Sequence, residues 1–323
     1  MRKVIFSLVC AMMVVLLYPR VFSFVYRLVP VKWWNERIAY GQIRDVCNPR
    51  IEDYQALQKF LAKARRPSLA RLGDMEKRAR HFCLIGKDPV ELPQEGKITV
   101  NCGKDEKENC LIIYASFNKA YPQGLRRLVD HVSKSDFKGH ILYRIGGWPN
   151  VAEGDLKLAH VPYAFKPCFF REAQQLGYRR VLWLDASIQP VVSLNRIFEE
   201  IAAKGYFAIG NGQYVAPFIN EQAAAGLGIT LKECEKIPSV SAGLFGVDFS
   251  HEKAALAIAK WHQAARDTAA FFSARPDQNA LSVILFQLDM QNWAPLSKIA
   301  ESSELLSKNI YFKIDRGYVQ YGK

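Results

Sequence analysis

The chain has 323 residues, and 50% of them are hydrophobic, which is enough to bury a sizeable core and excludes a disordered protein. Its formal net charge is +13, and residues 1–100 carry 18 Lys and Arg against 9 Asp and Glu. A basic segment beside an apolar terminus fits contact with anionic lipid headgroups better than nucleic-acid binding, which would place a basic stripe on the folded domain.

Residues 1–30 are predicted to form a membrane anchor or a signal segment. Two uncharged runs, residues 4–19 and 21–26, can together span a bilayer if Arg20 extends its charge to the interface. No clear small-x-small cleavage site follows, so an uncleaved single-pass anchor is expected, with a cleaved signal peptide as the alternative. Basic residues flank the run on both sides and leave the topology open.

Residues 31–107 are predicted to form a stem of amphipathic helices, or an accessory layer packed on the main domain. The period of residues 50–61 is helical, and prolines and a glycine between residues 88 and 96 indicate a linker. Seven cysteines occur in the chain without a CxxC pair or a Cys/His metal spacing. Cys102 and Cys110 flank a charged loop, where they would be bridged in an oxidising compartment or remain as reduced thiols.

Residues 108–323 are predicted to form one globular domain of the α/β class. Apolar runs of strand length alternate with stretches of helical period, and short loops join them, which predicts a mostly parallel sheet with helices on both faces. The expected strands are 111–118, 139–145, 181–184, 206–209 and 241–247, and the expected helices are 125–132, 165–177, 194–204 and 251–265.

The segment 181–190 is the strongest candidate for a functional strand end. An unbroken apolar run stops abruptly at Asp185 and Ser187, before Pro190. The carboxyl ends of strands are where open α/β sheets bind ligands, although an Asp at this place can also simply cap a turn. Dinucleotide-binding and P-loop glycine motifs are absent from the sequence.

The order of these elements resembles the GT-A-fold glycosyltransferases over roughly residues 108 to 316. The likeness to the nucleotide-binding half of that fold rests on residues 164–167 (AFKP), 178–187 (YRRVLWLDAS) and 210–212 (GNG). The likeness to the acceptor half rests on residues 241–247 (SAGLFGV), the helix 251–265 and residues 276–279 (PDQN).

The resemblance implies a donor site around the 181–187 strand. Asp185 matches the first acid of the family's Asp-x-Asp motif, whereas Ser187 stands where the second acid would be. Asp277 would point at the acceptor hydroxyl, as a general base or as an orienting group, so Asp185 and Asp277 are the expected catalytic residues. Alternatively, Asp277 serves only as the N-cap of the helix that it opens. The expected donor-binding residues are Ser116, Asn118, Lys166, Arg171, Asp185, Ser187 and Gly243, and Trp148 or Trp183 could stack on a base or a sugar.

A divalent cation, Mn²⁺ or Mg²⁺, is implied by the family but is in doubt here because of Ser187. The resemblance leaves two possibilities: Asp185 binds the metal together with Asp315, or the enzyme works without metal. In the second case Lys166 and Arg171 would offset the charge of the leaving diphosphate.

The sequence thus predicts a membrane-anchored glycosyltransferase that moves a sugar from a nucleotide diphosphosugar to an acceptor hydroxyl on a glycan or lipid. The alternatives are a catalytically inactive GT-A-like protein that binds glycan or nucleotide, and a nucleotidyltransferase. The last should have a basic triphosphate loop after its first strand, and residues 116–119 (SFNK) match such a loop poorly.

Overall fold

A computed structural model of the chain describes residues 92, 95–115, 121–145, 161, 163–267, 269–301 and 309–314. The predicted anchor and most of the predicted stem lie outside these residues, as do Ser116, Asn118, Trp148 and Asp315. Within the part of the chain that is described, no helix is both long enough and apolar enough to cross a bilayer.

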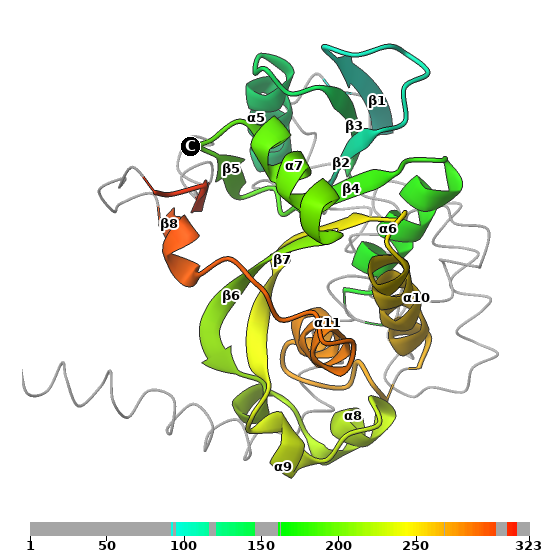
Figure 1. The fold of residues 1–323 in the computed structure, drawn as a ribbon, viewed down its shortest axis with the longest axis vertical. Coiled ribbons are helices and arrows are strands. Elements are labelled where there is room, and N and C mark those ends of the chain that lie inside the picture. Colours follow the sequence, from blue (N-terminus) through cyan, green and yellow to red (C-terminus); the bar gives the residue numbers. More distant parts are fainter. Residues whose placement is uncertain are drawn as a thin grey trace, which may run out of the picture.

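Six strands form one mixed sheet in the order β1-β3-β2-β4-β7-β6 (Figure 1). The pairs β2/β3 and β2/β4 are parallel, whereas the pairs β1/β3, β4/β7 and β6/β7 are antiparallel. The strands are β1 (Glu95–Val100), β2 (Asn109–Ala115), β3 (Gly139–Ile145), β4 (Arg180–Leu184), β6 (Tyr206–Tyr214) and β7 (Pro238–Asp248).

The α/β class is confirmed, but the sheet is mixed rather than mostly parallel. Parallel neighbours need a crossover connection: one helix connects β2 to β3, and the chain from β2 to β4 passes through two described helices and β3. β7 instead turns back between β4 and β6 and pairs antiparallel with both. β1 pairs with β3 at the sheet edge, so the sheet takes in residues 95–100 of the segment predicted as stem and linker.

Helices cover both faces of the sheet, as predicted (Figure 1). Leu182 and Leu184 of β4 belong to one buried core, and Val181 and Trp183 belong to the other, because successive side chains of a strand point to opposite faces. Burying one such large side chain contributes about 1.5–3 kcal/mol. The first core lies under α5 (Tyr121–Ser133) and α7 (Leu194–Lys204), and the second under α6 (Phe165–Gln175), α10 (Glu252–Arg266) and α11 (Pro276–Gln287).

The ends of α7 follow directly from the sequence. The Ser193 side chain accepts a hydrogen bond from the Asn195 amide at its start, and Gly205 closes it at a φ of 83°. The short helices α8 (Glu221–Gly226) and α9 (Leu231–Cys234) connect β6 to β7. Cys102 and Cys110 are free thiols, and burial raises the pKa of the Cys110 thiol well above its usual value.

A second, three-stranded sheet follows the tip of β4. Its order is β5-β9-β8, where β5 is Ile188–Pro190, β9 is Phe312–Ile314 and β8 is Ile299–Glu301. β5 and β9 are antiparallel, and β8 and β9 are parallel. The chain between Leu184 and Ile188 is therefore held between two sheets.

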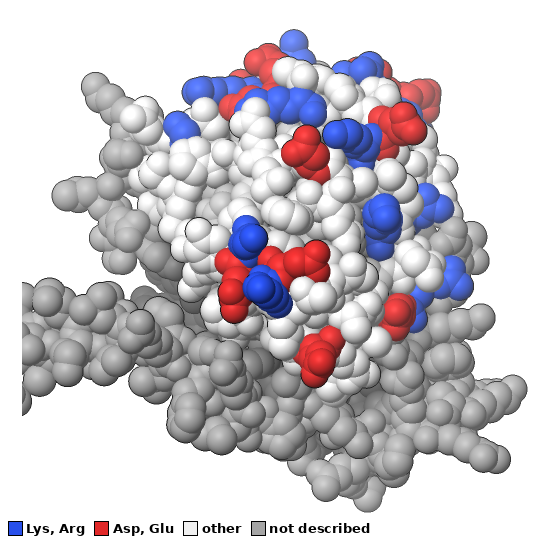
Figure 2. Space-filling model, turned by 60° about the horizontal axis from the view of Figure 1, so that its bottom comes forward, with Lys and Arg blue, Asp and Glu red and all other residues white. Residues whose placement is uncertain are grey.

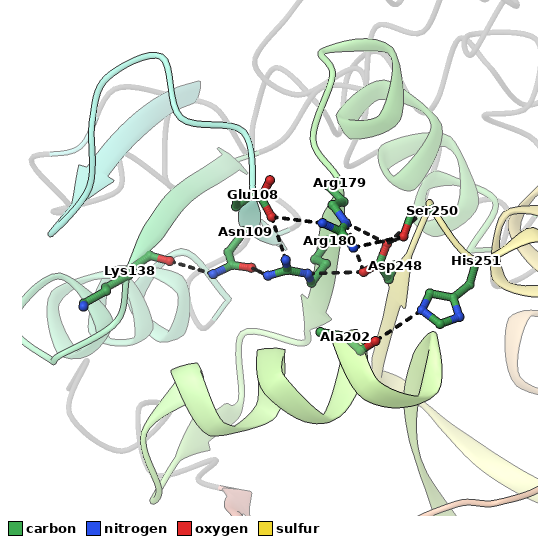
Figure 3. Close-up of polar contacts among 9 residues, drawn as sticks. All are labelled: Glu108, Asn109, Lys138, Arg179, Arg180, Ala202, Asp248, Ser250 and His251. Atoms are coloured by element: carbon green, nitrogen blue, oxygen red, sulfur yellow. Dashed lines mark hydrogen bonds and ion pairs between the residues drawn. The ribbon is translucent and has the colours of Figure 1, made fainter.

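The opposite end of β4 is fixed by a buried carboxylate, Asp248 at the end of β7 (Figure 3). Arg179 and Arg180 place their Nε atoms 3.3 Å and 3.2 Å from Asp248 Oδ2. The Ser250 amide donates to Asp248 Oδ1 at 2.8 Å, and Arg180 also pairs with Glu108 at 2.6 Å. Burial alone would raise the pKa of Asp248, but the hydrogen bonds from Ser250 and the charge of Arg179 outweigh it and lower that pKa.

We expect Asp248→Asn to lower the free energy of unfolding by about 2 kcal/mol near neutral pH, because it leaves two arginines without their shared carboxylate. A carboxyl group whose pKa is lowered by folding stabilises the protein above its unfolded value of about 3.9 and loses that effect as the pH falls through the native value. Urea unfolding of both proteins between pH 3 and 7 checks this. A stability difference that grows on acidification would contradict the assignment.

Candidate active site

The candidate site is built on a buried ammonium group that lies between two carboxylates. Lys166 Nζ is 2.8 Å from Asp277 Oδ2 and 3.4 Å from Asp185 Oδ1, and it donates to the Ala242 carbonyl at 3.0 Å. The lysine residue is 4% exposed. α6, the tip of β4, β7 and α11 thus each contribute one member, which brings together residues 111 positions apart in the chain.

Lys166 remains charged in this environment. Burial disfavours the ammonium form, but the negative charges of Asp185 and Asp277 outweigh burial and raise the pKa of Lys166 above its usual value. A lysine ammonium has three N–H donors, and three described acceptors surround this one. Lys166 therefore has no donor left for a phosphate group in this arrangement.

Asp185 is the accessible acid of the pair, with 41% of its side chain exposed. Its Oδ1 accepts a hydrogen bond from Trp183 Nε1 at 2.8 Å, and its amide donates to the Gly243 carbonyl at 2.8 Å. A Cβ atom at Gly243 would lie 2.6 Å from Asp185 Oδ2. Glycine is therefore required at position 243 because the carboxylate passes directly over the β7 backbone.

Asp277 is the buried acid, with 9% of its side chain exposed. It lies in the first turn of α11, where Arg275 is the N-cap and Pro276 occupies the first turn, so Asp277 is not the cap. Its carbonyl oxygen accepts a hydrogen bond from Trp261 Nε1 at 3.1 Å. The rigid start of α11 thus sets where this carboxylate points.

Uncharged polar groups continue the site along β6 and β7. Ser239 Oγ lies 3.1 Å from both Gln278 Nε2 and Asn211 Nδ2. Amides and hydroxyls can each donate and accept hydrogen bonds, which suits a ligand rich in hydroxyl groups. No sequence pattern indicated this set, because its three members come from three separate elements.

The structure brings together four of the residues predicted from the sequence: Asp185, Lys166, Gly243 and Asp277. Ser187 is half-buried in the turn that follows Asp185. Arg171 donates to Gln174 on its own helix, and no described contact joins it to the cluster. Trp183 is 1% exposed and orients Asp185, so the prediction that it stacks on a ligand is wrong. Ser116, Asn118 and Asp315 lie outside the described residues.

The described residues do not by themselves form a divalent-cation site. They contain no group of three or more His, Cys, Asp or Glu side chains that could hold a metal ion. Asp185 offers one oxygen, Oδ2, while its Oδ1 is already bound by Trp183 and Lys166. Mg²⁺ and Mn²⁺ need several oxygen ligands, so a cation here would depend on Asp315 and on the phosphates of a ligand.

Charged side chains of both signs are mixed on the face shown in Figure 2. Basic and acidic side chains of the described residues lie next to one another in several mixed clusters on that face, and uncharged surface lies between the clusters. A nucleic-acid site would require a continuous basic stripe.

Comparisons with known proteins give little guidance. No protein-family model matches the chain, and no curated protein matches its sequence. Among solved structures, the apo form of mouse xyloside xylosyltransferase 1 is similar, with a TM-score of 0.37 and 8% sequence identity over 64% of this chain and 96% of that chain. A TM-score this low does not allow an activity to be inferred from the similarity. The function is therefore inferred from the geometry of the site.

We expect Lys166→Met to lower the free energy of unfolding by about 3–5 kcal/mol, because it leaves a buried and a half-buried carboxylate facing each other without a cation. The double variant Lys166→Met/Asp277→Asn should recover part of that loss. Chemical denaturation at pH 7 measures both, and Lys253→Met on the exposed face of α10 is the matched control. A Lys166→Met protein as stable as this control would show that the ion pairs do not hold the site together.

Proposed function

We propose that the protein is a glycosyltransferase that moves a sugar from a nucleotide diphosphosugar to a hydroxyl group of a glycan or lipid acceptor. The observation that carries this proposal is the Lys166-centred pair of carboxylates at the carboxyl end of β4, one accessible and one buried. Open α/β sheets bind their ligands at this edge. Two acids that share one cation but differ in exposure can bind two different partners, the donor and the acceptor.

Asp185 would hold the donor. Its half-exposed carboxylate accepts hydrogen bonds, which suits ribose or sugar hydroxyls, and Trp183 and Lys166 fix its orientation before the ligand arrives. Ser187, two residues further along the same turn, carries a hydroxyl group that would join it.

Asp277 would meet the acceptor. Lys166 binds Asp277 Oδ2, and no described residue hydrogen-bonds Oδ1, which can therefore accept a hydrogen bond from the acceptor hydroxyl. During transfer the bond between the sugar and the diphosphate oxygen breaks with its electron pair on the diphosphate, a bond to the acceptor oxygen forms, and the acceptor proton passes to the Asp277 carboxylate as general base. The amide groups of Asn211 and Gln278, which the buried Ser239 hydroxyl links, would help to position the acceptor sugar.

The leaving diphosphate needs a counter-charge that Lys166 does not supply in this structure. Three acceptors already surround its ammonium group, so its role is to fix the two carboxylates. Mn²⁺ or Mg²⁺ held in part by Asp185 and Asp315, or cations from chain outside the described residues, would supply that charge.

We expect Asp185→Asn to reduce sugar transfer at least about a hundredfold, because the neutral amide can no longer accept the same hydrogen bonds and also lacks the charge that balances Lys166. The assay screens a panel of nucleotide sugars with and without Mn²⁺ and follows release of the nucleoside diphosphate. Thermal unfolding measures the stability of the variant separately. If the variant is unfolded to the same extent that it is inactive, the assignment of Asp185 to the site is wrong.

A matched pair of glycine variants makes this test sharper. Gly243→Ala pushes Asp185 aside without removing its charge, since the added Cβ would meet Oδ2 at 2.6 Å. Gly210→Ala in β6 is the control, because the nearest atom to its added Cβ is 3.7 Å away, an ordinary contact. Transfer should fall in the first variant and persist in the second.

The second candidate is a catalytically inactive domain that binds glycan or nucleotide. Ser187 in place of a second acid and the fully occupied ammonium of Lys166 favour it. Binding of one nucleotide sugar without turnover, with or without Mn²⁺, would favour the inactive binding domain over the glycosyltransferase.

A further inference from the structure

Basic side chains from three elements lie at the small sheet: Arg196 and Lys298 contact Tyr311, and Lys313 belongs to β9. Phe312 of β9 and Tyr311, which directly precedes this strand, are both buried in the core under α5 and α7, whereas Lys313 is half-buried. Lys313 pairs with Gln189 of β5 and with Ala300 of β8. Lys298 ends the short helix η4 (Leu296–Lys298) and leads into β8 beside Tyr311.

Two cations converge on the Tyr311 ring from different elements. Arg196, in the first turn of α7, donates from Nη2 to Tyr311 Oη at 2.8 Å, and its Cζ lies 4.7 Å from the ring centroid. Lys298 Nζ lies 4.3 Å from the same centroid, and the Tyr311 amide donates to the Lys298 carbonyl at 2.7 Å. One side chain thus fixes the positions of two positive charges.

Neither cation is neutralised by an acid. Within the described residues, Arg196 and Lys298 form no ion pair, and their contacts are those with Tyr311. By contrast, the arginines at the far end of β4 share the Asp248 carboxylate. Cation–π contacts with Tyr311 supply no formal negative charge, so the charges of both side chains stay uncompensated within the described residues. Most N–H groups of Arg196 and all those of Lys298 remain available to an anion.

We propose that Arg196 and Lys298, held by Tyr311, form a binding site for a phosphate-type anion. Such an anion offers three or more acceptor oxygens and up to two negative charges, which match an arginine fork beside a lysine. The site is separate from the candidate active site. The Val191 amide donates to the Tyr311 carbonyl at 2.8 Å, which places Tyr311 three residues beyond Ile188, on the order of 10 Å along the strand from the Asp185 turn.

Exposed apolar side chains border this site. Val191, beside Tyr311, is 46% exposed, and Leu296, on the same short helix as Lys298, is 49% exposed. Cations next to protruding apolar groups match the boundary between lipid headgroups and acyl chains. The anion thus has two possible sources with the same chemistry, a phospholipid headgroup and a soluble phosphate group.

The test compares the double variant Arg196→Gln/Lys298→Gln with the wild type as full chains. Sodium phosphate is titrated by calorimetry at constant ionic strength, and flotation is measured with phosphatidylglycerol vesicles and with phosphatidylcholine vesicles. We expect the double variant to weaken binding about tenfold in at least one arm, as the loss of a charge-assisted hydrogen bond would. An effect confined to phosphatidylglycerol vesicles identifies a headgroup, and an effect with sodium phosphate identifies a soluble ligand.

The control is Lys253→Gln/Lys260→Gln, which removes the same charge from the exposed face of α10. It corrects for general attraction between vesicles and the basic chain. Should the double variant fold poorly, Lys298→Gln alone keeps the hydrogen bond between Arg196 and Tyr311. The proposal is overturned if binding changes equally in the site variants and the control, or in neither. Since Asp185→Asn leaves this surface intact, the result does not depend on glycosyl transfer.

Discussion

The ion pairs of Lys166 with Asp185 and Asp277 are the interaction on which the rest of the site depends. They join a helix on one face of the sheet to the tip of β4 and to the start of α11. A buried ammonium without these partners would be strongly unfavourable, and so would Asp277 without its cation. The close approach of Asp185 to Gly243 and the hydrogen bond from Trp183 then fix the orientation of the Asp185 carboxylate.

Buried charges are paired differently at the two ends of β4. At one end, two arginines share one carboxylate that is fully buried, and the network closes on itself (Figure 3). At the other end, one lysine shares its charge between two carboxylates, and one of these remains half-exposed. The first arrangement has stability as its main consequence. The second leaves an oriented acid in contact with solvent, which is what a binding site requires.

Much of the framework could be predicted from local sequence signals. The helix at 194–204 and the strand at 139–145 have the predicted bounds, because a serine cap and a closing glycine mark the helix and a run rich in apolar residues marks the strand. The direction of β7 could not be predicted, since pairing depends on contacts between distant segments. The same limit applies to the site: Asp185 and Asp277 were identifiable singly, but their shared partner Lys166 lies in a third element and had been expected to bind phosphate.

A crystal structure of the full chain with a bound nucleotide diphosphosugar would test the central claim most directly. The account predicts a ribose or sugar hydroxyl within hydrogen-bonding distance of the Asp185 carboxylate, with the contacts of Lys166 to both acids intact. A nucleotide bound away from the carboxyl end of β4, or a diphosphate that draws Lys166 away from Asp277, would contradict it.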